Sequence, residues 1–105
     1  MTKGIRNSAI LALVISLAGA MSFAQSSGEA TYKGKCQMCH GATGTPSPAM
    51  GKAMGIKPTS DPDIKKLTVA EIEGVVKNGK GKMKPISGLD DAQVKAVSEF
   101  FKTLK

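Results

Sequence analysis

Two cysteines and a histidine stand close together in the first half of the chain, at Cys36, Cys39 and His40. This C-x-x-C-H spacing is the attachment signature of c-type haem. Two thiols can add across the two vinyl groups of one porphyrin to form thioether bonds, and the histidine that follows can bind the iron. The pattern therefore predicts one haem c per chain, with Cys36 and Cys39 as covalent anchors and His40 as the proximal iron ligand.

A bare C-x-x-C pair has other uses, namely a thioredoxin-like dithiol, a structural disulfide or half of a zinc site. A thioredoxin-like motif belongs to a βαβ unit, and the sequence shows no such pattern. A zinc site needs about four ligands, whereas the chain offers 2 Cys and 1 His. The adjacent histidine favours haem, and a disulfide or dithiol stays the alternative.

The second face of the iron needs a ligand from elsewhere, because the chain has only 1 His. Met38 lies inside the attachment turn, on the proximal side. Met50 and Met54 stand four residues apart soon after the motif, a spacing that indicates core packing. Met83 stands in a Gly- and Lys-rich loop, where a lone apolar side chain has little packing use. A thioether is a soft ligand that raises the potential of haem iron, and we expect Met83 to be the distal ligand.

A loop with two prolines follows the motif. A proline carbonyl there can accept the second N–H of the His40 imidazole, which fixes the ring and raises its basicity. We assign this role to Pro48, with Pro46 as the rival. The alternative is that both prolines only shape the turn.

The N-terminus has the pattern of a secretory signal peptide. Basic residues precede an apolar run within residues 9–18, and Ser22-Phe23-Ala24 offers the small residues that signal peptidase selects. We predict that residues 1–24 are a cleaved signal peptide and that residues 25–105 form a single domain. The apolar run is short for a membrane span of about 20 residues. The cleaved protein is therefore expected in the periplasm or another extracytoplasmic space, without spanning the membrane.

The chain is basic, with 15 Lys+Arg against 8 Asp+Glu. Beyond the predicted signal every basic residue is a lysine, and none forms a dense tract, which weighs against nucleic acid as a partner. Scattered lysines suit transient docking with acidic redox proteins, and ordinary solubilising charge is the alternative. We expect Lys80, Lys82 and Lys84 to border the docking edge of a monomer.

Apolar residues at steps of three and four predict helices along the domain, and no alternating strand pattern is present. Two helices begin with capping boxes, Thr68 with Glu71 and Asp90 with Gln93. The predicted helical ranges are 26–35, 49–55, 68–78 and 90–105. Residues 56–64 contain two prolines and predict irregular chain.

Few large apolar side chains are available for a core. The aromatic residues that follow the predicted cleavage site are Tyr32, Phe100 and Phe101. Chains of this size have difficulty burying enough surface, and a covalently held porphyrin would supply the missing core. We expect the last helix to pack on the first near Tyr32, and the protein without haem to be poorly folded.

From about residue 30 to the C-terminus the sequence resembles the small class I bacterial cytochromes c. Residues 32–41 resemble the haem-attachment helix of that family, residues 48–52 its proximal proline stretch and residues 78–83, N-G-x-G-x-M, its axial methionine loop. The closing stretch at residues 97–104 is similar to its last helix. The resemblance implies an all-α fold of about four short helices wrapped around one covalently attached haem.

Two positions depart from the pattern of that family. Most relatives have proline directly after the axial methionine, whereas here Lys84 separates Met83 from Pro85. Two prolines, Pro46 and Pro48, also stand where relatives usually have one.

The function predicted from these residues is soluble one-electron transport between exported proteins, and not enzymatic catalysis. Iron held on both faces by His40 and Met83 leaves no open position for a substrate. One alternative is a haem module that senses a small gas ligand through a labile Met83, which carbon monoxide binding at neutral pH would favour. Another is a cytochrome subunit of a larger oxidoreductase, which co-purification with one stable partner would favour.

Overall fold

The structure of the protein is a computed structural model that describes residues 27–105. The predicted signal peptide over residues 1–24 lies outside this range. Within it the chain forms helices and no strand, with one isolated β-bridge between Lys80 and Met83. The all-α prediction is confirmed. None of the described helices is long and apolar enough to cross a membrane.

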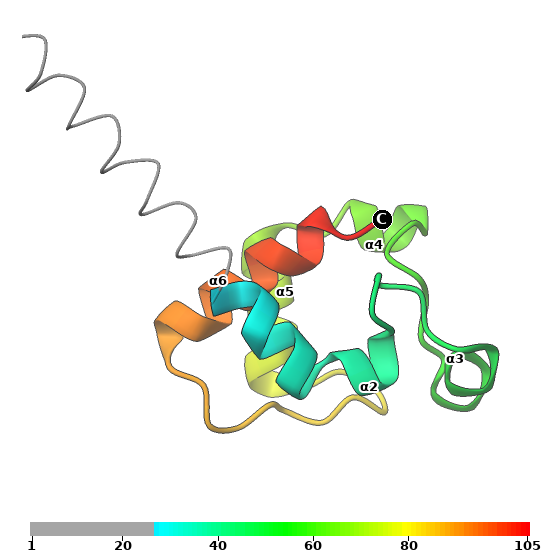
Figure 1. Ribbon diagram of the computed structural model, residues 1–105, viewed down its shortest axis with the longest axis horizontal. Helices are drawn as coiled ribbons and strands as arrows, with labels where there is room; N and C mark the ends of the chain where they lie inside the picture. Colours follow the sequence, from blue (N-terminus) through cyan, green and yellow to red (C-terminus); the bar gives the residue numbers. More distant parts are fainter. Residues whose placement is uncertain (1–26) are drawn as a thin grey trace, which may run out of the picture.

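The helices follow one another around the molecule and match the four predicted helical ranges (Figure 1). A helical run over residues 27–35 leads into α2 (Gln37–His40), and α3 (Pro48–Met54), α4 (Pro62–Lys65), α5 (Val69–Asn78) and α6 (Asp91–Thr103) follow. The helix that delivers the C-x-x-C-H motif is therefore interrupted at Cys36, the first residue of the motif.

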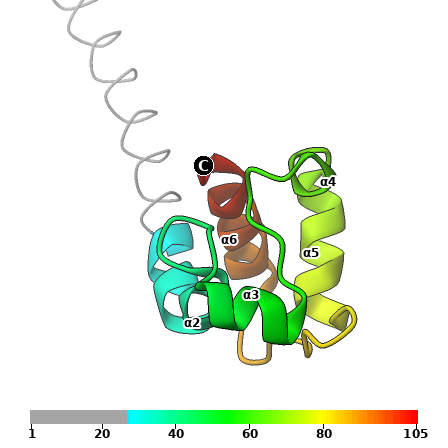
Figure 2. The ribbon, with the colours of Figure 1, turned by 90° about the vertical axis from the view of Figure 1, so that its right-hand side faces the viewer.

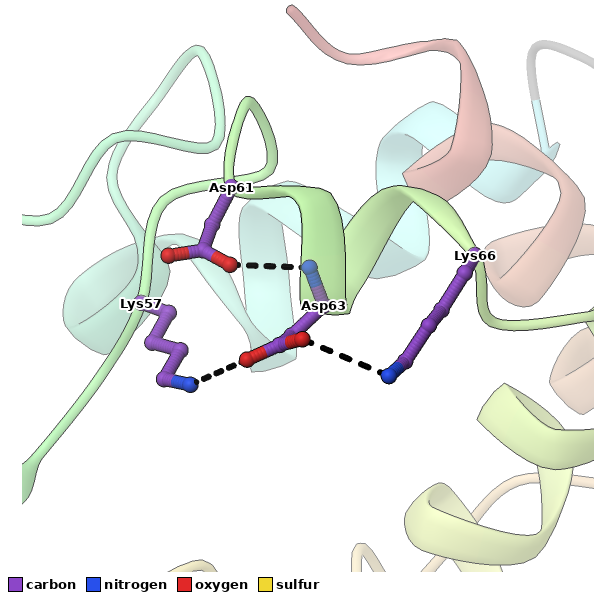
Figure 3. Close-up of polar contacts among 4 residues, drawn as sticks. All are labelled: Lys57, Asp61, Asp63 and Lys66. Carbon is purple, nitrogen blue, oxygen red and sulfur yellow. Dashed lines mark hydrogen bonds and ion pairs between the residues drawn. The ribbon is translucent and has the colours of Figure 1, made fainter.

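The short helix α4 lies where the sequence predicts irregular chain, and that prediction is wrong there. The Asp61 side chain accepts a hydrogen bond of 2.8 Å from the Asp63 amide, and Pro62 occupies the first turn, where its missing N–H leaves nothing unpaired. On the exposed side, Asp63 pairs with Lys57 at 2.8 Å and with Lys66 at 3.3 Å (Figure 3). Proline after an aspartate cap thus starts a helix here.

Both predicted capping boxes are confirmed. The Glu71 amide donates to the Thr68 hydroxyl and the Thr68 amide to the Glu71 carboxylate, each at 3.1 Å. Asp90 and Gln93 exchange the equivalent bonds at 2.8 and 2.9 Å. These caps satisfy orphan N–H groups and fix where α5 and α6 begin.

The core lies between α5 and α6. Ile72, Val76 and Val94 form its buried cluster, and the partly buried residues around it are Leu67, Ile86, Leu89 and Phe101. Tyr32 and Val97 complete the five buried hydrophobic side chains of the described chain. This is a small core, as the shortage of large apolar residues predicts.

The helical run at residues 27–35 meets α6 at a glycine, and the two helices cross there (Figure 1). A Cβ on Gly28 would collide with the Ala96 carbonyl and lie 2.9 Å from the Phe100 Cβ, so the backbones can approach only because residue 28 has no side chain. One turn later, Tyr32 is 1% exposed, and its ring centroid lies 5.5 Å from that of Phe100. The predicted packing of the last helix on the first is confirmed.

Gly28→Ala should destabilise the haem-loaded protein by about 1–3 kcal/mol, the usual cost of overpacking a close contact. The obstacle is backbone carbonyl, which cannot swing aside as a side-chain end can. Guanidinium unfolding followed by circular dichroism measures the change. Gly34→Ala is the matched control, because nothing lies within 4 Å of a Cβ there and alanine favours the helix. Equal unfolding midpoints for the two variants would show that the close crossing is not required.

Candidate functional site

Cys36, Cys39 and His40 lie on one short helical turn. Cys36 is the N-cap of α2, and its carbonyl oxygen accepts the Cys39 amide at 3.2 Å and the His40 amide at 3.0 Å. Both cysteines are half-buried free thiols. The turn thus brings together two thiols and one imidazole, the three groups that the sequence predicts for haem attachment.

Burial sets the protonation of these groups. It raises the pKa of the Cys36 thiol, and the nearby Cys39 adds to the effect. Burial lowers the pKa of His40 below its ordinary value. The imidazole is therefore neutral at neutral pH and keeps a ring lone pair, the form in which histidine binds metals.

Two aromatic side chains support His40. The Phe101 ring meets the imidazole edge-on, with 5.7 Å between centroids, and the Tyr32 ring lies 6.4 Å from that of Phe101. The Tyr32 hydroxyl donates a hydrogen bond of 2.5 Å to the carbonyl of Gly41, directly after His40. The sequence predicts Tyr32 as a packing residue but carries no signal for this bond, because only the fold shows which carbonyl lies within reach.

The loop after His40 doubles back on itself. Gly41 has φ +83°, and a Cβ there would collide with the backbone at residue 45 and lie 3.3 Å from the Pro46 nitrogen. Pro48 is the first residue of α3. The pairing of His40 with the Pro48 carbonyl, or with its rival Pro46, stays a prediction.

Met83 belongs to a tight turn. Lys80 and Met83 exchange two backbone hydrogen bonds of 2.9 and 3.0 Å, closing a turn in which Gly81 has φ +56°. Gly79 admits the turn, since a Cβ there would lie 2.6 Å from the Met83 carbonyl oxygen and 2.9 Å from the Pro85 ring. Met83 itself is half-buried. The backbone of the predicted distal ligand is therefore fixed although no proline follows it directly.

Two further bonds anchor the Met83 loop, defined here as residues 79–86, to helices. The Ile86 amide donates to the Val76 carbonyl of α5 at 2.9 Å. The Lys82 ammonium donates to the Ala53 carbonyl of α3 at 2.8 Å. In Figure 2 this loop (yellow) reaches the C-terminal end of α3 (green). The loop is thus joined to α5 on one side and to α3 on the other.

A cavity of about 520 Å³ opens beside Phe101, the residue that contacts His40. Its volume falls within the range of cofactor pockets, about 300–1,000 Å³. Ile64, Phe101 and Leu104 give it apolar walls, and the polar lining consists of Thr59, Ser60, Lys65, Lys102 and Lys105. Cys36, Cys39, His40 and Met83 are not among its lining residues, so the cavity adjoins the site only through Phe101. The fit to haem rests instead on the donor set, because two free thiols and a neutral imidazole lie on one helical turn.

Comparison with known proteins agrees with this fit. The family model described as cytochrome c oxidase, cbb3-type, subunit III matches residues 23–101. The chain belongs to the small class I c-type cytochromes. Cytochrome c-555 of Methylococcus capsulatus (strain Bath) is 31% identical to this cytochrome over 101 residues, covering 83% of this chain and 76% of that protein.

A solved structure gives the same result for the fold. The KustC0563 c-type cytochrome matches this cytochrome with a TM-score of 0.64 and 25% identity, over 74% of this chain and 96% of its own. The all-α cytochrome c fold and the family resemblance are therefore confirmed. Membership of the family implies a c-type haem, which Cys36, Cys39 and His40 would hold.

Substitution of Tyr32 should change how the stability of this cytochrome responds to alkaline pH. Burial, with a smaller effect of Cys36, raises the pKa of Tyr32 to about 12, against about 10 in an unfolded chain. Because the folded state binds the proton more tightly, the stabilisation is complete below about pH 10 and is lost as the pH rises to about 12.

Tyr32→Phe should therefore lower the free energy of unfolding by about 1 kcal/mol at pH 8, through loss of the bond to Gly41. This gap in unfolding free energy between the parent and Tyr32→Phe should narrow between about pH 10 and 12. Denaturant unfolding of both haem-loaded proteins at several pH values measures it. The chain has 1 Tyr, so no other tyrosine contributes. A gap that stays constant with pH would contradict the assignment.

Proposed function

We propose that this cytochrome is a soluble, exported one-electron carrier with one haem c, held by Cys36 and Cys39 and ligated by His40 and Met83. The observation that supports it best is the fixed turn around Met83, whose backbone is held by two bonds to Lys80. A methionine held in this way is suited to permanent ligation. It is less suited to a site that must open for a substrate.

When bound, the haem supplies a one-electron couple at its iron. The chain contributes two ligands that need not move when the charge of the site changes. Phe101 backs the His40 imidazole, the Tyr32 hydroxyl ties down the next residue, and the Lys80–Met83 turn restrains the thioether. Electron transfer is favoured by such a site because little structural rearrangement accompanies it.

The distribution of charge supports docking to an acidic partner. Residues 30–60 and 74–89 contain no Asp or Glu. Their lysines are Lys33, Lys35, Lys52, Lys57, Lys77, Lys80, Lys82 and Lys84. The bond from Lys82 to Ala53 joins these two segments in space, and Met38, 91% exposed, lies in the first. Lysines without acidic residues in the same segments suit weak, salt-sensitive association.

The ligation is tested by far-red absorption of the oxidised, haem-loaded protein at neutral pH. The parent should show a sulfur-to-iron charge-transfer band, and Met83→Ala should lack it. Met54→Ala is the control, because Met54 is a half-buried methionine of α3 and should leave the band in place. Absence of the band from the parent would mean another distal ligand or an open iron, and would reopen the sensing function.

The docking surface is tested by stopped-flow reduction with a strongly acidic reduced flavodoxin over a range of salt concentrations. The rate constant for the parent should fall as salt rises. Lys80→Ala combined with Lys84→Ala should lower the rate at low salt by about tenfold and flatten the salt dependence. Lys95→Ala combined with Lys105→Ala removes the same charge outside the two acid-free segments and should change the rate constant and its salt dependence much less. If the two double variants slowed reduction equally, net charge would explain the salt dependence and no particular docking surface would be required.

The family description favours a second function, a cytochrome subunit of a terminal oxidase of the cbb3 type. Purification without affinity tags from its own source distinguishes the two. A free carrier should appear alone in the aqueous fraction. A subunit should require detergent and remain with the same large partner at a fixed ratio.

A further inference from the structure

Lys82 differs from the two other lysines of the Met83 loop. Its ammonium donates a hydrogen bond of 2.8 Å to the Ala53 carbonyl, 29 residues away. Lys80 and Lys84 are exposed, and neither forms an ion pair among residues 27–105. Of these three lysines, Lys82 is the one that joins two distant segments.

The acceptor of this bond is a helix-end carbonyl. α3 ends at Met54, and Gly55, with φ +67°, returns its amide to the Gly51 carbonyl. The last carbonyls of a helix have no partner within the helix, and Ala53 carries one of them. An ammonium at this end both satisfies the carbonyl and meets the negative end of the helix dipole. The bond from Lys82 therefore stabilises the C-terminal end of α3.

The bond also connects the two sides of the haem site. α3 follows the loop that leaves His40, and Lys82 directly precedes Met83. Because Lys80 and Met83 close a turn with two backbone bonds, residues 80–83 move as one unit. A restraint on Lys82 is therefore a restraint on Met83.

We propose that Lys82 is a positioning residue that clamps the Met83 loop to the C-terminal end of α3 and so limits how readily Met83 leaves the iron. The inference rests on the proposed His40 and Met83 ligation. It divides the three lysines by role: Lys82 holds the loop, and Lys80 and Lys84 serve docking. It also gives α3 two roles, because the helix would hold the Met83 loop on the distal side as well as the loop that follows His40 on the proximal side.

The test is imidazole binding to the oxidised, haem-loaded protein at neutral pH, followed by the visible spectrum. Imidazole can reach the iron only when Met83 has moved away, so its apparent affinity reports the population of the open loop. Lys82→Ala should bind imidazole about threefold to tenfold more tightly, the effect of losing one hydrogen bond of ordinary strength. Lys84→Ala is the matched control, because it removes the same charge on the other side of Met83, and its affinity should stay within about twofold of the parent.

Lys82→Arg keeps a cationic donor and should return the affinity toward that of the parent. Equal imidazole affinities for Lys82→Ala and Lys84→Ala would overturn the clamp, as would an arginine variant no better than the alanine one. The far-red band separates this failure from failure of the proposed ligation. If all the proteins show the band and bind imidazole equally, the proposed clamp is rejected and the His40 and Met83 ligation stands. If the parent lacks the band, the proposed ligation is rejected as well.

Discussion

The small number of buried apolar side chains is the constraint on which the site depends. The described chain buries five hydrophobic side chains, and domains of this size have little core to stabilise them. Phe101 shows how the deficit and the site are linked, because it packs against the core of α5 and α6 and also contacts His40. The cofactor side of the molecule is therefore continuous with its core, and a covalently held group cannot be lost from that core by dissociation.

The Met83 loop shows how a departure from a family pattern can be accommodated. Proline usually follows the axial methionine in relatives, and its ring stiffens the backbone there. In this chain Pro85 is one residue further on, and its ring lies over Gly79, where no side chain could fit. The stiffness that the missing proline would give comes from the two bonds between Lys80 and Met83.

Features with a local signal could be predicted from the sequence, and features made by distant contacts could not. The starts of α5 and α6 are set by side chains that bond backbone three residues away, as at Thr68 and Asp90. α4 was missed because proline suggests a break unless the aspartate before it is recognised as a cap. The C-x-x-C-H turn needs only five consecutive residues.

The hydrogen bonds that hold the site in place could not be predicted from sequence patterns. The Tyr32 hydroxyl meets the Gly41 carbonyl, and the Lys82 ammonium meets the Ala53 carbonyl, across 9 and 29 residues of chain. Neither pair has a characteristic spacing, since each depends on how whole helices are placed. The proposed haem ligands therefore come from the sequence pattern and stay a prediction, while the residues that support them are seen only in the fold.

The last turn of α6 has a consequence for local unfolding of the protein. Phe100 packs on Tyr32, Phe101 contacts His40, and the Lys102 ammonium donates to the Lys65 and Leu67 carbonyls at 3.0 and 2.6 Å. One helical turn thus contacts the first helix, His40 and the segment between α4 and α5. Local unfolding of that turn alone would remove all of these contacts together.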